Sequence, residues 1–213
     1  MNQTTRSYNS CAHAYDRKFS SYTLYTERIA DFARQLPREC RILDLGCGSG
    51  INAQLMNQLG HSVTGIDLSE SMIDLARRRC PGLPFLKGAA ESAGELLANS
   101  GIPLPFDALC LSFLIVHLEE PECTRLLGTV KNLVKSGGFL YLSFMPYAPG
   151  KAHGYESTSF SQDHIYFHYH KEEHIKAVLK EQGFQLVSEI REDYKEADGS
   201  ITEDLFLIFR QST

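Results

Sequence analysis

Three glycines and one carboxylate carry the clearest chemical signal in this sequence. Gly46, Gly48 and Gly50 directly follow the apolar run Arg41–Leu45, and Asp67 ends a second apolar run. A loop of glycines can turn sharply and let a ligand approach its backbone, because glycine has no Cβ. A carboxylate at the end of the next strand can accept bonds from two ribose hydroxyls, each worth about 1.5–3 kcal/mol. The pattern therefore predicts a nucleoside site.

The spacing of the glycines separates the candidate ligands. A dinucleotide loop reads Gly-x-Gly-x-x-Gly, whose third glycine would fall where this chain has Ile51. The loop also lacks the Lys-Ser/Thr pair with which a P-loop binds triphosphates. An NAD(P)-binding oxidoreductase is therefore a less favoured alternative. It also remains possible at this point that the glycines only turn the chain and that Asp67 only caps a helix starting at Ser69.

Predicted strands and helices alternate around this loop. Apolar runs indicate strands at 41–45, 62–66, 83–87, from 106 onward and at 139–144, and helical spacing indicates helices at 51–59, from Ser69, at 91–99 and at 121–135. This alternation is typical of a parallel sheet with helices on both faces. Such a sheet binds ligands at the carboxyl ends of its strands, where the glycine loop and Asp67 are expected.

The two ends of the chain depart from the alternation. Segments 184–190 and 205–209 both read as strands, and Asp198-Gly199 between them predicts a turn. No helix fits between these strands, so we expect the last strand to be antiparallel. An amphipathic helix is predicted over 21–36, ending at Pro37. The whole chain is expected to form one domain.

The composition limits the class of protein and its partners. The chain has 213 residues, of which 43% are hydrophobic and 22% charged, values typical of a globular domain. The formal net charge of −5 disfavours unaided binding to nucleic acid or to an anionic membrane. We find no secretory signal, no apolar run near the ~20 residues of a membrane span, and no Cys-x-x-Cys pair. We therefore expect a soluble cytoplasmic protein, monomeric or homodimeric.

The segment 42–50, Ile-Leu-Asp-Leu-Gly-Cys-Gly-Ser-Gly, resembles motif I of the class I S-adenosylmethionine-dependent methyltransferases. Segment 7–16 is similar to the N-terminal lid of the small-molecule branch of this family, and 106–118 resembles motif IV. Segment 133–141 is similar to the strand entry of the family, with Ser136 where proline is usual. The resemblance extends over nearly the whole chain.

The resemblance implies an α/β fold. It is a Rossmann-like three-layer sandwich, whose seven-stranded, mostly parallel sheet has an antiparallel last strand and an N-terminal helical lid. On this basis we expect a lid at 1–37, a cofactor-binding core at 38–145, an acceptor-covering segment at 146–175, and a final helix with strands at 176–213.

The resemblance also implies a set of cofactor contacts. Gly46 and Gly48 would back the methionine part, Asp44 would reach its amino group directly or through water, and Asp67 would hold the ribose. Leu68 would cover the adenine, Ser112 would contact the cofactor near sulfur, and Tyr8 and Tyr15 would close over the sulfonium, where an aromatic face can make a cation–π contact. The candidate cofactor residues are Tyr8, Tyr15, Asp44, Gly46, Cys47, Gly48, Asp67, Leu68, Ala90, Glu91 and Ser112.

One position departs from the pattern of the family. The family commonly has Gly-Asp-Ala after the third strand, with the acid on the adenine amine, whereas this chain has Gly88-Ala89-Ala90-Glu91. Ala89 cannot accept that hydrogen bond. The adenine amine is therefore expected to meet backbone or Glu91, or the affinity is reduced.

His117 is the candidate catalytic base, since it follows Ser112 by about one helical turn. An imidazole with an ordinary pKa near 6.5 suits proton transfer at neutral pH. The alternative is a structural role, capping the next helix or packing on the sheet.

A concentration of tyrosine and histidine between 145 and 174 is the candidate acceptor region. Strand alternation over 165–170 predicts that Tyr166, His168 and His170 share one face while Phe167 and Tyr169 share the other. The candidate acceptor residues are Tyr147, His153, Tyr166 and His168. A zinc site built from His-x-His and a later histidine is the alternative for this region.

These observations predict an enzyme that transfers a methyl group from S-adenosyl-L-methionine, leaving S-adenosyl-L-homocysteine. The expected acceptor is a small molecule methylated on oxygen or nitrogen without a metal, and the aromatic region favours a phenolic, carboxylate or heteroaromatic compound. The Asn/Asp-Pro-Pro-Tyr run of adenine and glutamine N-methyltransferases is absent after Ser112. A methyltransferase of proteins or other macromolecules is a less favoured function, as is a cofactor-binding regulator without turnover.

Overall fold

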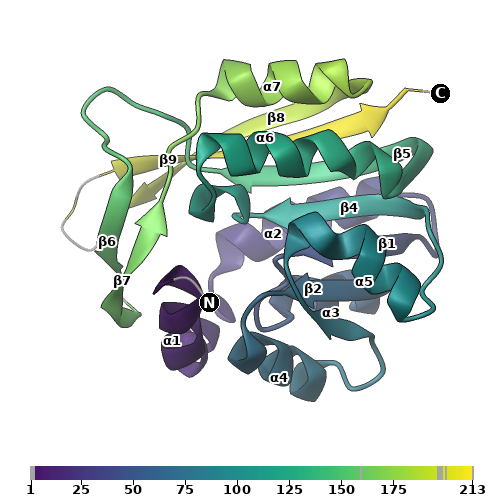
Figure 1. Cartoon of the computed structure of the whole chain (residues 1–213), viewed down its shortest axis with the longest axis horizontal. Coiled ribbons are helices and arrows are strands. Elements are labelled where there is room, and N and C mark those ends of the chain that lie inside the picture. Colours follow the sequence, from purple (N-terminus) through teal and green to yellow (C-terminus); the bar gives the residue numbers. More distant parts are fainter. Residues whose placement is uncertain (1–2, 159, 196–198, 200, 213) are drawn as a thin grey trace.

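A seven-stranded sheet organises the structure, a computed structural model that describes residues 3–158, 160–195, 199 and 201–212 (Figure 1). The strand order is β3-β2-β1-β4-β5-β9-β8, and β9 runs antiparallel to both β5 and β8. The pairs from β3 to β5 are parallel. The strands are β1 (Arg41–Leu45), β2 (Ser62–Asp67), β3 (Phe85–Lys87), β4 (Phe106–Ser112), β5 (Val134–Phe144), β8 (Phe184–Lys195) and β9 (Ile201–Gln211). The predicted mostly parallel sheet with an antiparallel last strand is confirmed.

Helices cover both faces of this sheet. They are α1 (Gln3–Phe19), α2 (Thr23–Gln35), α3 (Ile51–Gln58), α4 (Glu70–Arg79), α5 (Ala93–Asn99), α6 (Glu120–Thr129) and α7 (Glu172–Glu181). Side chains of β1 alternate between the two cores: Ile42 packs with residues of α2, α3 and α4, whereas Leu43 packs with residues of α5, α6 and α7. The predicted three-layer arrangement is therefore confirmed. No helix of the described residues is long and apolar enough to span a membrane.

Two elements lie outside the three layers, beside the carboxyl ends of the parallel strands. Helix α1 contacts α4 and a separate hairpin formed by β6 (Gly154–Thr158) and β7 (Ser161–Phe167) (Figure 1). Ser7 Oγ donates to the carbonyl of His164 at 3.1 Å, and Tyr166 N donates to Thr4 Oγ1 at 3.3 Å. The lid helix and the hairpin thus support each other over the end of the sheet.

The predicted boundary between the sixth helix and the fifth strand is wrong. We expected a helix to Lys135, but α6 ends at Thr129, a 3₁₀ turn follows over Val130–Asn132, and β5 already begins at Val134. Gly138 lies inside the strand, where a Cβ would fall 2.7 Å from the carbonyl oxygen of Asp107. The glycines therefore permit close approach between β4 and β5 at a register shift instead of stopping a helix.

The C-terminal boundaries differ more modestly from expectation. Helix α7 begins at Glu172, so the expected segment boundary at 175 falls inside it. Gly199 has a φ of 86° between β8 and β9, as a turn residue should, while Asp198 lies outside the described residues.

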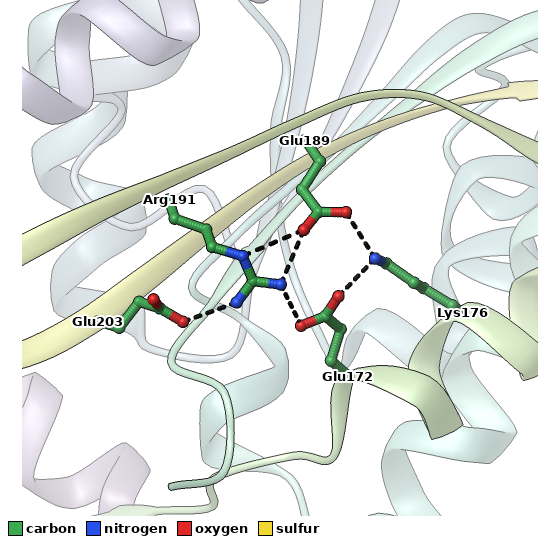
Figure 2. Close-up of polar contacts among 5 residues, drawn as sticks. All are labelled: Glu172, Lys176, Glu189, Arg191 and Glu203. Carbon is green, nitrogen blue, oxygen red and sulfur yellow. Dashed lines mark hydrogen bonds and ion pairs between the residues drawn. The ribbon is translucent and has the colours of Figure 1, made fainter.

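An ion-pair network fastens α7 to the antiparallel edge of the sheet (Figure 2). Arg191 of β8 pairs with Glu172 of α7 at 2.5 Å, with Glu189 of β8 at 2.7 Å and with Glu203 of β9 at 2.7 Å. Lys176 pairs with Glu172 and, at 2.6 Å, with Glu189. The cations hold the pKa of Glu189 below its ordinary value. A network of this kind can stabilise more than an isolated surface pair does.

We predict that Arg191→Met lowers the free energy of unfolding by about 1–2 kcal/mol at low salt, because three partly exposed pairs are lost together. Urea denaturation at 50 mM and 1 M NaCl measures the effect, which should shrink at the higher salt as the charges are screened. Arg78→Met is the matched control, since Arg78 is exposed and makes no ion pair among the described residues. A loss of stability equal to that of Arg78→Met, or independent of salt, would contradict the prediction.

Candidate functional site

A cavity of about 1090 Å³ lies at the carboxyl ends of β1, β2 and β4. Its floor is the glycine loop with Asp67 and Ser112, and its roof is α1 together with the β6–β7 hairpin. Pockets for one small ligand are typically about 300–1,000 Å³. This cavity therefore lies at the upper end of the usual range for a ligand site.

The glycine loop has the backbone conformation that its sequence predicts. Gly46, Gly48 and Gly50 have φ values of 73°, 52° and 79°, in the region that glycine adopts without strain. A Cβ on Gly50 would lie 3.0 Å from the backbone of Ala76 in α4, so this glycine permits close packing of the helix. A Cβ on Gly48 would meet only Tyr15, at 3.9 Å. Gly48 therefore presents its backbone to the cavity.

Asp67 joins the loop to the end of β2. Its Oδ2 accepts from Gly48 N at 2.9 Å and its Oδ1 accepts from Ser69 N at 2.8 Å. Burial raises the pKa of Asp67, although these backbone N–H groups favour the charged form. The cap of α4 is Ser69, whose Oγ accepts from Met72 N at 3.3 Å. The Asp67 carboxylate can therefore also accept hydrogen bonds from a ligand in the cavity, because its oxygens have lone pairs left for further donors.

Asp44 lies beneath the loop and not on the cavity surface. It is 0% exposed, and the thiol of Cys110 gives its carboxylate a weak hydrogen bond. Burial, with a contribution from the charge of Asp67, raises its pKa to about 7. A thiol is a weak donor, so the charged form of this buried carboxyl group is costly, and a cation at the loop above it would stabilise that form.

His117 links three elements that are distant in sequence. Its Nδ1 lies 2.9 Å from the carbonyl oxygen of Tyr166, and its Nε2 lies 2.9 Å from the hydroxyl of Tyr8. A carbonyl can only accept, so Nδ1 carries the proton and Nε2 accepts from the Tyr8 hydroxyl. Burial lowers the pKa of His117 to about 4 and raises that of Tyr8 well above its ordinary value. Both side chains are therefore neutral at physiological pH.

Polar contacts hold α1 and its two tyrosines over the cavity. Arg79 of α4 pairs with Asp16 at 2.5 Å and donates to the carbonyl of Ser49 in the glycine loop at 3.0 Å. Asn9 Oδ1 accepts from Ser69 Oγ at 2.7 Å. The rings of Tyr8 and Tyr15 both line the cavity, meeting edge to face at 5.8 Å between centroids. An ion pair and hydrogen bonds thus connect α1, the glycine loop and α4.

The other residues expected to contact the cofactor also lie together. Leu68, Ala90, Glu91 and Ser112 line the cavity, as do Gly46, Cys47 and Gly48. Leu68 is 43% exposed, which is unusual for a leucine beside a core strand and suits a residue that a ligand covers. Ala89 also lines the cavity and has no side chain that can accept a hydrogen bond.

The residues expected to bind the acceptor lie elsewhere. Tyr147, His153, Tyr166 and His168 are absent from the cavity lining, which contains Phe167 and Tyr169 instead. Strand β7 ends at Phe167, so the predicted alternation does not continue to His170. The ring of His168 stacks on that of His153 with centroids 3.8 Å apart, away from the lining. Tyr166 contributes its backbone carbonyl to His117 and its hydroxyl to His168.

The zinc alternative fails on the same geometry. His170 Nε2 lies 2.8 Å from the carbonyl oxygen of Ile115, and His174 Nε2 lies 2.9 Å from Thr124 Oγ1, so these two nitrogens are engaged with separate partners. Across 3–158, 160–195, 199 and 201–212, no three histidine, cysteine or acidic side chains are arranged to hold a metal.

An aromatic wall at the far end of the cavity is a feature that the sequence did not predict. Tyr25 of α2 lies 4.8 Å from Phe113 and 6.1 Å from Phe19 between ring centroids. The hydroxyl of Tyr25 donates to the buried Asp204 at 2.7 Å. Phe113 has a φ of 52°, a strained conformation for a bulky residue and one that clusters at functional sites. The wall comprises Phe19, Tyr25, Phe113, Phe160 and Tyr194.

A family model described as a methyltransferase domain matches residues 15–189, most of the chain. The chain belongs to this family. The recognition as a class I S-adenosylmethionine-dependent methyltransferase, made from the glycine loop, is confirmed, and the donor of that class is S-adenosylmethionine.

Solved structures share the fold of this methyltransferase. An S-adenosylmethionine-dependent methyltransferase from Clostridium acetobutylicum ATCC 824 aligns with a TM-score of 0.70 and 17% identity, covering 97% of this chain and 99% of that chain. Magnesium protoporphyrin IX methyltransferase from Synechocystis PCC 6803, solved with bound S-adenosylmethionine, aligns with a TM-score of 0.66 and 17% identity, covering 90% and 80%.

Curated relatives are similar over a shorter segment. The mitochondrial ubiquinone biosynthesis O-methyltransferase of Schizosaccharomyces pombe is 35% identical over 103 residues, which is 48% of this chain and 37% of that protein. Arsenite methyltransferase of Mus musculus is 34% identical over 119 residues, 49% of this chain and 30% of that protein. The chain thus spans less than half the length of both relatives.

We predict that Asp67→Ala weakens binding of S-adenosylhomocysteine by about 2–3 kcal/mol, because charge-assisted bonds to the ribose are lost. Titration calorimetry measures the dissociation constant, and circular dichroism verifies the fold of the variant. Asp74→Ala is the matched control, since Asp74 is an exposed acid of α4 outside the cavity. An unchanged dissociation constant in folded Asp67→Ala would remove this residue from the cofactor site.

Proposed function

We propose that this chain transfers a methyl group from S-adenosylmethionine to a small-molecule acceptor. The observation that carries the proposal is one roofed cavity, which contains the glycine loop and Asp67 as well as His117 and the aromatic wall. Membership of the methyltransferase family supplies the reaction class. The proposed cofactor seat and the proposed acceptor seat would share this one partly open cavity.

The residues of the floor fit the cofactor. Asp67 would hold the ribose through its remaining lone pairs, the backbone at Gly46 and Gly48 would support the methionine part, and Leu68 would cover the adenine. Burial raises the pKa of Asp44 to about 7, and the ammonium group of the cofactor would favour its charged form. When bound, S-adenosylmethionine supplies an electrophilic methyl group on a sulfonium. The rings of Tyr8 and Tyr15 can stabilise that positive charge through cation–π contacts.

The roof favours a small acceptor over a macromolecule. Helix α1 and the β6–β7 hairpin are joined by hydrogen bonds beside the cavity, and together they narrow the approach of a folded protein or nucleic acid to the floor. The net charge of −5 also disfavours nucleic acid. The names of two relatives, ubiquinone biosynthesis O-methyltransferase and arsenite methyltransferase, refer to small molecules as well.

His117 is the group placed to accept a proton. The carbonyl of Tyr166 holds the ring in the tautomer whose lone pair is on Nε2, and Nε2 faces the cavity beside Tyr8. As the acceptor oxygen or nitrogen bonds to the methyl carbon and the carbon–sulfur bond breaks, the acceptor proton passes to Nε2. The enzyme's main task is to align these atoms, with the reacting atoms about 3–3.5 Å apart.

The test has two separate parts. Titration calorimetry with S-adenosylhomocysteine and, in parallel, with NADH examines the cofactor seat, and binding of NADH alone would overturn the proposal. A panel of phenols, carboxylic acids, amines and heteroaromatic compounds is then incubated with methyl-labelled cofactor. Labelled small-molecule products support the proposal, whereas label that enters only protein or nucleic acid of a cell lysate overturns the assignment of a small acceptor.

We predict that His117→Ala lowers kcat by about 100-fold or more, the usual contribution of a general base, and leaves the affinity for S-adenosylhomocysteine within twofold. His153→Ala, a histidine outside the cavity lining, is the control and should retain activity. An unaltered kcat in His117→Ala would leave His117 with a structural role only.

The pH profile of kcat/KM gives an independent prediction. The pKa of His117 is lowered to about 4, so Nε2 is protonated, and the rate falls, only as the pH drops through about 4. We therefore expect no loss of activity attributable to His117 between pH 6 and 8. An acid limb centred near the ordinary histidine value of about 6.5, and absent from His117→Ala, would contradict the neutral, desolvated imidazole.

A further inference from the structure

The hydroxyl of Tyr8 occupies the one acceptor position on His117. Nδ1 is committed to the carbonyl of Tyr166, so Nε2 holds the only lone pair of the ring, and it accepts from Tyr8 Oη at 2.9 Å. A lone pair in the plane of an imidazole takes one well-aligned donor. Any substrate that gives its proton to Nε2 must first replace the Tyr8 hydroxyl.

The side chain that donates to His117 Nε2, Tyr8, is itself a phenol and is surrounded by aromatic rings. The Tyr8 ring meets His117 edge to face at 5.2 Å and lies nearly parallel to Phe160, at 6.4 Å and 23°. Tyr15 adds an edge-to-face contact at 5.8 Å. Phe160 belongs to the aromatic wall, whose other members, Phe19, Tyr25, Phe113 and Tyr194, line the same cavity. A second aromatic ring in the cavity could therefore make the same stacked and edge-to-face contacts that the Tyr8 ring makes.

The chemistry of the position selects among acceptors. Nε2 needs a donor that keeps its proton at neutral pH, as a phenol does with an ordinary pKa near 10. A carboxylic acid is ionised at that pH and has no proton to donate. An aliphatic alcohol keeps its proton but offers no ring to the aromatic lining, which favours offset or edge-to-face contacts.

We propose that the acceptor is a phenol, and that Tyr8 is an internal stand-in for it that must leave Nε2 before methyl transfer. This inference rests on the proposed function. The acceptor hydroxyl takes the place of the Tyr8 hydroxyl, its proton moves to Nε2, and its oxygen bonds to the methyl carbon as the carbon–sulfur bond breaks. The products are an aryl methyl ether, the thioether of S-adenosylhomocysteine and an imidazolium that returns its proton to solvent.

Helix α1 need not leave for this exchange. Its other bonds, from Ser7 to the hairpin, from Asn9 to Ser69 and from Asp16 to Arg79, involve neighbouring side chains and not Tyr8 itself. Rotation of the Tyr8 side chain is enough to vacate Nε2. The lid can thus stay closed over the cofactor while the acceptor competes for His117.

Tyr8→Phe tests the inference, since it keeps the ring and removes only the competing hydroxyl. The probes are 4-methylphenol and its methyl ether, 4-methylanisole, each titrated into the protein with and without S-adenosylhomocysteine. Nitrogen-15 NMR of the His117 imidazole reports the donor on Nε2 directly. We expect Tyr8→Phe to bind 4-methylphenol about 2- to 10-fold more tightly than the unmodified chain, the net effect of one hydrogen bond. Binding of 4-methylanisole should not change.

Tyr147→Phe is the matched control, because it removes a tyrosine hydroxyl outside the cavity lining and should leave both affinities unchanged. Weaker or equal binding of 4-methylphenol by Tyr8→Phe, or an Nε2 signal that 4-methylphenol does not shift, would overturn the inference. If S-adenosylhomocysteine binds while phenols do not compete with Tyr8, the inference alone fails. If S-adenosylhomocysteine does not bind at all, the proposed function fails with it.

Discussion

The bonds that Asp67 accepts from Gly48 and Ser69 are the interaction on which the site depends. They fix the glycine loop to the end of β2, and Ser69 in turn starts α4. From α4, Arg79 reaches back to the loop at Ser49 and outward to Asp16 in the lid. One partly buried carboxylate therefore sets the geometry of the loop, the helix and, through them, the lid. Its cost of burial is offset by backbone donors and leaves capacity for a ligand.

The site divides into parts that sequence could and could not reveal. The loop, Asp67 and the strands that carry them were predicted correctly, because each is encoded by neighbouring residues: glycine where φ is positive, apolar runs where both faces of the sheet are buried. The cofactor residues expected from the family lie on or directly under the cavity floor and lid. Local signals were sufficient there.

The acceptor end could not be derived from the same kind of signal. The alternation expected over 165–170 fails because β7 stops at Phe167, and the chain then bonds to η2 (Ile115–His117) through His168 N and the carbonyl of Val116. Tyr25 lies in the helix predicted over 21–36, for which no role in the site was expected, yet it lines the cavity. Tyr8 and His117 are 109 residues apart and meet only because α1 folds back over the sheet. Such pairings are decided by tertiary packing.

The surroundings of His117 also constrain how a proton could be transferred. A phenol with a pKa near 10 and an imidazole with a pKa of about 4 differ by about six units, or about 8 kcal/mol against transfer before methylation. Complete deprotonation in advance would therefore contribute a large part of the barrier. As the oxygen begins to bond to carbon, however, it loses electron density and its proton becomes far more acidic. In the proposed reaction the neutral imidazole thus holds and orients the hydroxyl first, and receives the proton only as the new bond forms.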